Sequence, residues 1–144
     1  MKLKILIAAM ALAACDLPPG EGTSNRYAFV SPYGPRVNPV NAQEFEVILG
    51  PSGTFDGYWC GASEYARRKL GAGWSDRIYV ASPIGPSLTT ERSSAVRFTL
   101  DPAAIGVTPT EQFFRWGINV GDSMTISQGR TRCETALPIR AGRF

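Results

Sequence analysis

The sequence predicts an α+β fold: one antiparallel sheet of about five or six strands, with one main helix packed on one face. Two observations support this. Residues 57–70 form a sizeable stretch with helical periodicity, and the segments after it are short runs in which apolar and polar side chains alternate. Short turns join the last of these runs, and parallel strands would need a longer crossover. The sheet is therefore expected to be antiparallel.

The expected helix has one apolar face. At 100° per residue, this face gathers Tyr58, Trp59, Ala62, Ala66 and Leu70 within about a third of the circumference. The opposite face, expected to lie in water, carries Glu64, Arg67 and Arg68.

Both ends of this helix are also indicated. Asp56 is suited to cap the first turn, because its carboxylate can accept from a free backbone N–H. Arg67, Arg68 and Lys69 crowd the last turn, where the helix dipole favours cations. Gly71 follows and is expected to adopt the left-handed conformation that ends many helices.

The strands are assigned from two-residue alternation between turn-forming residues. Six are expected over residues 44–49, 76–81, 94–100, 114–120, 123–127 and 131–137, and residues 26–30 are a candidate for a short first strand. Inward positions include Phe45, Val47 and Leu49; Val96, Phe98 and Leu100; Phe114, Trp116, Ile118 and Val120; and Met124 and Ile126. Pro32, Pro35 and Pro39 predict an irregular arm after the first strand, and residues 101–105 predict one helical turn.

The amino terminus has the pattern of an export signal. Lys2 and Lys4 precede ten apolar residues, 5–14. This run is much shorter than the roughly 20 residues that a membrane-spanning helix needs. Residues 1–14 are therefore expected to be a signal peptide that is removed from the mature protein.

The end of this run, Leu12-Ala13-Ala14-Cys15, resembles the lipobox of bacterial lipoprotein precursors. The resemblance implies cleavage before Cys15, a diacylglyceryl thioether on its sulfur and a fatty acyl group such as palmitate on the new amino group. Asp16 resembles the signal that retains lipoproteins in the inner membrane of enteric bacteria, so the inner membrane is favoured over the outer. The alternative is ordinary cleavage after Ala11-Leu12-Ala13, which leaves Cys15 as a thiol.

The mature chain divides into two parts. Residues 15–25 are expected to be the lipidated cysteine and a flexible tether, and residues 26–144 a single α+β domain in the periplasm. Removing residues 1–14 takes two of the 15 basic side chains, so 13 basic residues face 12 acidic ones. This near-neutral balance points to no nucleic acid or other strongly charged partner.

The absence of histidine from the sequence excludes serine–histidine and cysteine–histidine catalysis and the usual zinc sites. The run Cys60-Gly61-Ala62-Ser63 near a helix start is similar to the nucleophile segment of some peptidases, but it lacks an imidazole base. The carboxylates are scattered, and the sequence does not show that any two converge as a glycosidase requires. No catalytic residue, metal or cofactor is therefore assigned.

Three side chains are candidates for exposed contacts. Trp74 follows Gly71-Ala72-Gly73, whereas Trp59 and Trp116 fall on expected core faces. Arg67 and Arg68 would suit anionic lipid or polysaccharide; the alternative is a solvated helix end.

Cys60 and Cys133 are expected to form a structural disulfide. Export places the domain in an oxidising compartment, and lipidation of Cys15 leaves two cysteines with one possible pairing. The predicted bridge ties the last strand to the first turn of the helix. The alternative is two buried free thiols.

Two classes of function remain open. The first is a non-catalytic, membrane-anchored cell-envelope lipoprotein that binds a protein or a cell-wall polymer. The second is a small carboxylate-dependent hydrolase acting on an envelope polymer. The segment 58–66 resembles small uncharacterised proteins of alphaproteobacteria, and this resemblance implies no activity.

Overall fold

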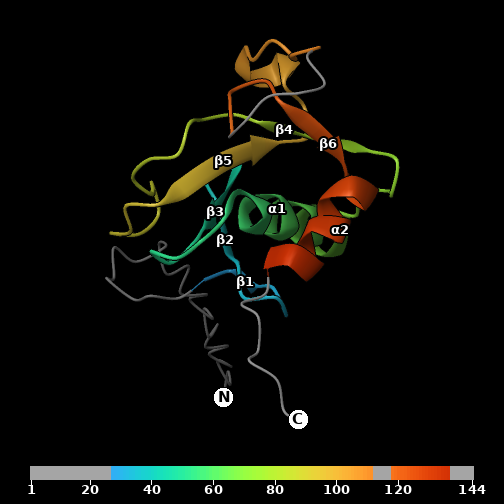
Figure 1. Cartoon of the computed structure of the whole chain (residues 1–144). Helices are drawn as coiled ribbons and strands as arrows, with labels where there is room; N and C mark the ends of the chain where they lie inside the picture. Colours follow the sequence, from blue (N-terminus) through green and yellow to red (C-terminus); the bar gives the residue numbers. More distant parts are fainter. Residues whose placement is uncertain (1–26, 112–117, 137–144) are drawn as a thin grey trace, which may run out of the picture.

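The computed structural model describes residues 27–111 and 118–136, and Figure 1 shows the arrangement of their helices and strands. In these residues six strands form one sheet in the order β1-β2-β3-β5-β4-β6, and every neighbouring pair is antiparallel. The strands are β1 (Phe29–Val30), β2 (Arg36–Pro39), β3 (Phe45–Ile48), β4 (Arg77–Val80), β5 (Ala95–Thr99) and β6 (Ser123–Thr125). The α+β prediction, a single antiparallel sheet with a main helix on one face, is confirmed.

The core lies between the sheet and the main helix, α1 (Phe55–Lys69). Alternate residues of β3 and β5 face α1, and the register places Val47 opposite Val96 and Phe45 opposite Phe98. The Phe98 ring meets that of Trp59 on α1 edge to face, with 5.3 Å between ring centroids. The sequence predicted these two strands correctly and placed Tyr58, Trp59, Ala62 and Ala66 on the packed face of the helix, where they are buried.

The two ends of α1 differ in how well they were predicted. The N-cap is Thr54, which makes no side-chain capping bond, so Asp56 lies within the first turn rather than before it. Asp56 still lies near the positive end of the dipole, but its carboxylate accepts from the hydroxyl of Thr135. At the other end Gly71 has φ 69°, the left-handed conformation expected there.

The prediction of which side of α1 faces water is partly wrong. Glu64 is buried, because a second helix covers it, whereas Arg67 and Arg68 are exposed as expected. Leu70, placed on the apolar face, is 47% exposed because it follows the last residue of the helix.

The second helix, α2 (Ile126–Ala136), replaces the strand expected over 131–137. It lies beside α1 (Figure 1). The predicted meander of three final strands is therefore wrong, and the predicted strand over 123–127 ends at Thr125, the last residue of β6.

The physical reason is a capping box at the start of α2. The backbone N–H of Thr125 donates to the Gln128 side chain at 3.0 Å, and the N–H of Gln128 donates to the Thr125 hydroxyl at 3.2 Å. These reciprocal bonds satisfy two of the free donors at a helix start. The pattern Thr-x-x-Gln is visible in the sequence, so this signal was available.

Two further expectations differ from the structure. The proline-rich arm contains β2, a strand in which Val37 is buried and which pairs with both β1 and β3. Pro39 is its last residue, where the missing N–H costs little. Between residues 118 and 122 the chain turns rather than forming a strand, so that Ile118 is buried but Val120 is exposed.

The remaining short element follows β5. Residues Ala103–Ile105 form one turn of 3₁₀ helix, η1, which ends at Gly106 in the left-handed conformation, as the sequence indicated. Phe114 and Trp116 lie outside the described residues. Among the helices of the described ranges, none has the length and apolar character to cross a bilayer.

Candidate functional site

The disulfide predicted between Cys60 and Cys133 is present, and both residues are fully buried. Their Cα atoms are 4.7 Å apart. The bridge joins α1 to α2, not α1 to a strand, because Cys133 lies on a helix. Cys15 and Asp16, predicted as the lipidated residue and the sorting signal, lie outside the described residues.

Polar contacts flank the disulfide along the two helices. One turn after Cys60, the buried carboxylate of Glu64 forms ion pairs with Arg130 of α2 at 2.9 Å and with Arg68 at 2.8 Å. The Arg130 guanidinium also packs over the ring of Tyr33, in the β1–β2 turn, and donates to its hydroxyl. These groups hold α2 in place. Arg130 approaches the Oε1 atom of Glu64 and Arg68 approaches Oε2, but the Arg68 contact lacks hydrogen-bond geometry.

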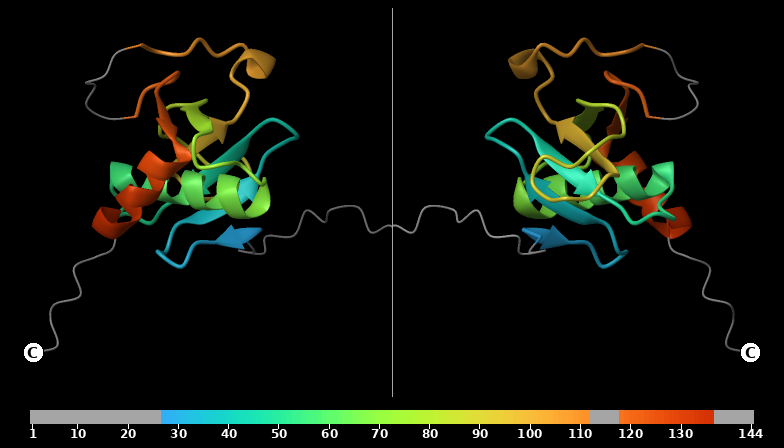
Figure 2. Two further views of the ribbon diagram at one scale, coloured as in Figure 1. Left: turned by 90° about the vertical axis from the view of Figure 1, so that its right-hand side faces the viewer. Right: turned by 90° about the vertical axis from the view of Figure 1, so that its left-hand side faces the viewer.

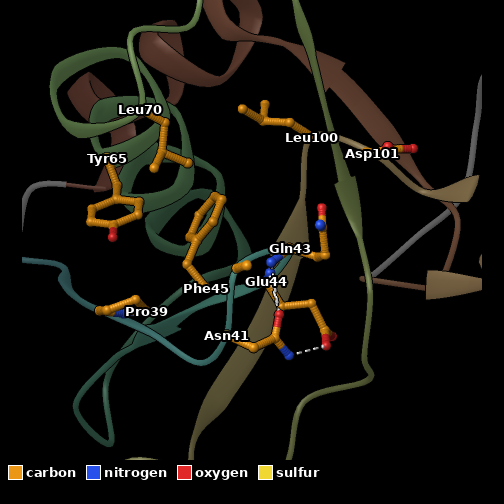
Figure 3. Close-up of a pocket in the computed structure, with 10 residues that line it drawn as sticks. Pro39, Asn41, Gln43, Glu44, Phe45, Tyr65, Leu70, Leu100 and Asp101 are labelled. Carbon is orange, nitrogen blue, oxygen red and sulfur yellow. Dashed lines mark hydrogen bonds between the residues drawn. The ribbon is translucent and has the colours of Figure 1, made fainter. Parts of the chain in front are cut away.

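A pocket of about 280 Å³ opens at the carboxyl-terminal end of α1 (Figure 3). Its apolar wall consists of Phe45, Tyr65, Leu70, Leu100 and Pro39. Its polar residues, on or next to the β2–β3 connection and after β5, are Asn41, Gln43, Glu44 and Asp101, with Ala42 beside them. An apolar wall with a few polar groups is the usual composition of a ligand pocket.

Tyr65 lies on the apolar side of the pocket with its ring against that of Phe45, at 4.8 Å between centroids. Burial raises the pKa of the Tyr65 phenol above its ordinary value. A tyrosine hydroxyl already holds its proton at neutral pH, and this shift keeps the Tyr65 hydroxyl neutral further into the alkaline range.

The two carboxylates of the pocket are both engaged. Glu44 forms an ion pair with Arg97 at 2.8 Å and accepts from the Asn41 amide at 3.0 Å. Figure 3 shows the Glu44 side chain turned toward Asn41 and away from Asp101. Asp101 accepts from the backbone N–H of Ala104 in η1. A glycosidase needs two carboxyl groups that face one substrate bond, and this pair does not converge in that way.

The candidate contact residues Trp74 and Arg67 lie together, next to the pocket residue Leu70. The Arg67 guanidinium carbon is 3.9 Å from the centroid of the Trp74 ring, which is 47% exposed. Arg68, the third candidate, points elsewhere, because its guanidinium pairs with Glu64. The sequence thus identified two neighbours in space but not the polar side of the pocket.

Glu46 is a buried carboxylate on β3, between the inward residues Phe45 and Val47. It alternates with Phe45 and Val47, so it points away from α1, and the β4–β5 loop covers it there. Its oxygens accept from the hydroxyl of Ser87, the N–H of Leu88, and both the N–H and the hydroxyl of Thr89. These bonds fix the loop and leave the Leu88 side chain 63% exposed.

In the described parts of the chain, no three acidic or cysteine side chains are grouped as ligands for a metal ion. Comparisons with models of protein families, with curated proteins and with solved structures give no significant match. The site must therefore be interpreted from its own chemistry.

Proposed function

We propose that this protein is a cell-envelope lipoprotein that is anchored to a membrane through Cys15 and binds a protein or a cell-wall polymer without transforming it. The lipobox-like end of the signal segment supports the anchor. The disulfide between Cys60 and Cys133 supports export, because such bonds form and persist in oxidising compartments such as the periplasm.

The pocket at the end of α1 supports the part of this proposal that concerns binding. Its aromatic and aliphatic wall suits the apolar face of a sugar ring or a peptide side chain, and the amide of Gln43 suits the accompanying hydroxyl or amide groups. Gln43 is exposed, so it is accessible to a ligand, whereas the Asn41 amide is bonded to the Glu44 carboxylate and to the backbone N–H groups of Gln43 and Glu44. The carboxylate of Glu44 is occupied by Arg97, which favours binding over acid–base chemistry.

Affinity capture tests the binding. The tagged full-length protein is recovered from its own membranes after mild cross-linking, and co-purifying proteins and wall fragments are identified. We expect a specific partner whose recovery falls when Gln43→Ala and Leu70→Ala are introduced together. Glu91→Ala, a change at an exposed residue of the β4–β5 loop, is the control. Equal recovery with the pocket variant would contradict a role for the pocket.

Metabolic labelling tests the anchor. With labelled palmitate, the wild-type protein should carry label and stay with the membrane fraction, and Cys15→Ser should lose both properties. A Cys15→Ser protein that still carries label would show that another residue is acylated. Density-gradient separation in the native host tests the inner-membrane placement suggested by Asp16, and a peak in the outer membrane would refute it.

The alternative is a hydrolase that uses carboxylates of the pocket, and one observation favours it: Glu44 and Asp101 line the same pocket. Screening the protein against wall fragments, esters and peptides should reveal binding and no turnover. If turnover is found and Glu44→Gln or Asp101→Asn abolishes it, the protein is a hydrolase and the proposal of a non-catalytic binding protein is refuted.

A further inference from the structure

The surface at the carboxyl-terminal end of α1 combines a cation, an indole and an aliphatic side chain. We define the α1-end patch as Arg67, Lys69, Leu70 and Trp74. Leu70 and Trp74 are each 47% exposed, although they are large apolar residues. Arg67 lies over the Trp74 ring, and Lys69 is exposed on the same last turn of α1. The patch therefore presents apolar surface directly bordered by positive charge.

Acidic side chains of the described residues do not neutralise the charge of the α1-end patch. Among the described residues, neither Arg67 nor Lys69 has a carboxylate within ion-pair distance, whereas Arg68 is paired with Glu64. The acid closest in sequence is Asp76, and its carboxylate accepts from the backbone N–H of Gly73 at 2.7 Å. The negative end of the helix dipole lies beneath these cations and favours their position without cancelling their charge.

This composition matches the interface between water and a lipid bilayer. Tryptophan is enriched at that depth because its ring is apolar and its N–H is polar. Arginine and lysine side chains lie along apolar surface and extend their charged ends to headgroups. Basic residues next to a bilayer are attracted to anionic lipids, and this attraction decays with distance from the surface over about one Debye length.

The place where the chain enters the fold directs the α1-end patch toward the membrane. The described part begins at Tyr27, and in β1 the ring of Phe29 lies 5.8 Å from that of Tyr65 on α1. Tyr65 is on the final two turns of α1, just before the patch. Figure 2 shows β1 beneath the carboxyl-terminal end of α1. Any anchor at the amino terminus is therefore attached near this end of the molecule.

The length of the intervening chain is also suitable. Eleven residues, 16–26, separate Cys15 from Tyr27. Their composition is that of a flexible coil, whose typical end-to-end distance is about 18 Å. This is short compared with a domain of this size, whose diameter is on the order of 30 Å. A lipid on Cys15 would thus hold the near end of the domain at the headgroups.

We propose that the α1-end patch rests on the surface of a bilayer containing anionic phospholipid, with Trp74 at the interface and Arg67 and Lys69 among the headgroups. The direction of approach relies on the anchor proposed above, whereas the chemistry of the patch does not. Because Leu70 also lines the pocket, the contact would place the pocket entrance beside the membrane.

Quenching of Trp74 by brominated lipid tests this contact. The mature protein is purified from host membranes and reconstituted into vesicles of brominated phosphatidylcholine, with or without phosphatidylglycerol. The Trp74 signal is the difference in emission between wild type and Trp74→Phe, which removes the contributions of Trp59 and Trp116. We expect this difference signal to shift to the blue and to lose intensity in the anionic vesicles, and the loss to shrink at high salt.

A charge variant and its control complete the experiment. Arg67→Gln with Lys69→Gln should weaken the quenching in anionic vesicles, whereas Arg92→Gln with Arg132→Gln should not. The two control arginines are also exposed but lie on the β4–β5 loop and on α2. Equal effects of the two double variants would show that only total charge matters and would overturn the patch.

Flotation of the same vesicles separates the patch from the anchor. If the protein floats with both vesicle types but Trp74 is not quenched, the proposed contact of the patch with the bilayer is refuted and the lipid anchor is supported. If the protein floats only with anionic vesicles, the contact of the patch with the bilayer is supported and the lipid anchor is refuted. If it floats with neither vesicle type, both proposals are refuted. A response of Trp74 to a soluble anionic wall polymer, with none to anionic vesicles, would assign the patch to that polymer instead.

Discussion

Individual polar residues decide much of how this small fold is held together. Two glutamates, Glu46 and Glu64, are buried with 0% and 2% exposure. Glu46 accepts from donors of the β4–β5 loop, and Glu64 pairs with Arg130 of α2 and with Arg68 on its own helix. A buried carboxylate is costly unless its oxygens are satisfied, so these donors must be in place when the protein folds. Each glutamate therefore fixes the position of the segment that supplies its donors.

The first prediction concerns Glu46. Changing Glu46→Ala leaves the donors of Ser87, Leu88 and Thr89 without their acceptor, and we expect a loss of about 3 kcal/mol in the free energy of unfolding. The β4–β5 loop should also lose order. Urea denaturation measures the stability, and hydrogen exchange at the Leu88 and Thr89 amides measures the order of the loop.

The control for Glu46 is Glu91→Ala, which removes an exposed acid from the same loop. We expect this variant to unfold as the wild type does. If the Leu88 and Thr89 amides exchange at the same rate in Glu46→Ala and in the wild type, Glu46 does not hold the loop.

The second prediction concerns Tyr65. Its pKa is raised by burial, so the folded protein retains the phenolic proton at a pH where the unfolded chain has begun to lose it. The unfolded state then binds fewer protons, and stability falls as pH rises above about 10. Tyr65→Phe should reduce this alkaline loss. Urea midpoints measured across the alkaline range give the slope, and an unchanged slope in Tyr65→Phe would exclude this tyrosine as its source.

At the scale of elements, α2 contributes little apolar area to its contact with α1. The buried residues of α2 are Ile126, Gly129 and Cys133, which lie three and four positions apart and so share one face. Gly129 lets this face approach α1 closely. A Cβ at that position would lie 2.9 Å from the Ser63 Cβ and 3.1 Å from the Trp59 carbonyl oxygen.

The third prediction follows from this close approach. Gly129→Ala gains up to about 1 kcal/mol in helix propensity, but crowding against a neighbouring helix costs about 1–3 kcal/mol. We expect a net loss in the free energy of unfolding, because α2 must move away from the backbone of α1. Gly85→Ala, where an added Cβ meets nothing within 4 Å, is the control. Stabilisation by Gly129→Ala would show that the two helices separate at no cost.

At the scale of the whole molecule, the disulfide is the covalent link between the end of the described chain and its centre. Cys60 and Cys133 are separated by 73 positions, and the intervening chain includes β4, β5 and β6. Closing a loop of this length lowers the entropy of the unfolded chain. The disulfide thus adds a covalent link to the small apolar contact that α2 makes with α1.

The fourth prediction is the contribution of this bridge. Replacing both cysteines, Cys60→Ala with Cys133→Ala, should lower the free energy of unfolding by roughly 4 kcal/mol on the chain-entropy model. Guanidinium denaturation of this variant and the wild type measures the difference. Alkylation without reductant, followed by mass spectrometry of the unfolded wild type, is the companion experiment, and modification of both thiols would show that the bridge is absent.

The sequence alone determined the α+β class, the helix over 57–70, the strands around residues 45, 78 and 97, and the pairing of Cys60 with Cys133. These features depend on local periodicity and on counting cysteines, and both are visible without long-range contacts.

Only the tertiary structure decided that the last segment is a helix. Thr131, Cys133 and Thr135 alternate as strand residues do, whereas the capping box favours a helix, and packing on α1, which Gly129 allows to be close, selected the second alternative. The burial of Glu46 and Glu64 could not be predicted from the sequence either, because a carboxylate is buried only where donors from distant segments converge on it. The pocket and the α1-end patch arise for the same reason: their residues come from α1, from β2, β3 and the connection between them, and from the segments that follow α1 and β5. Folding alone brings these residues together.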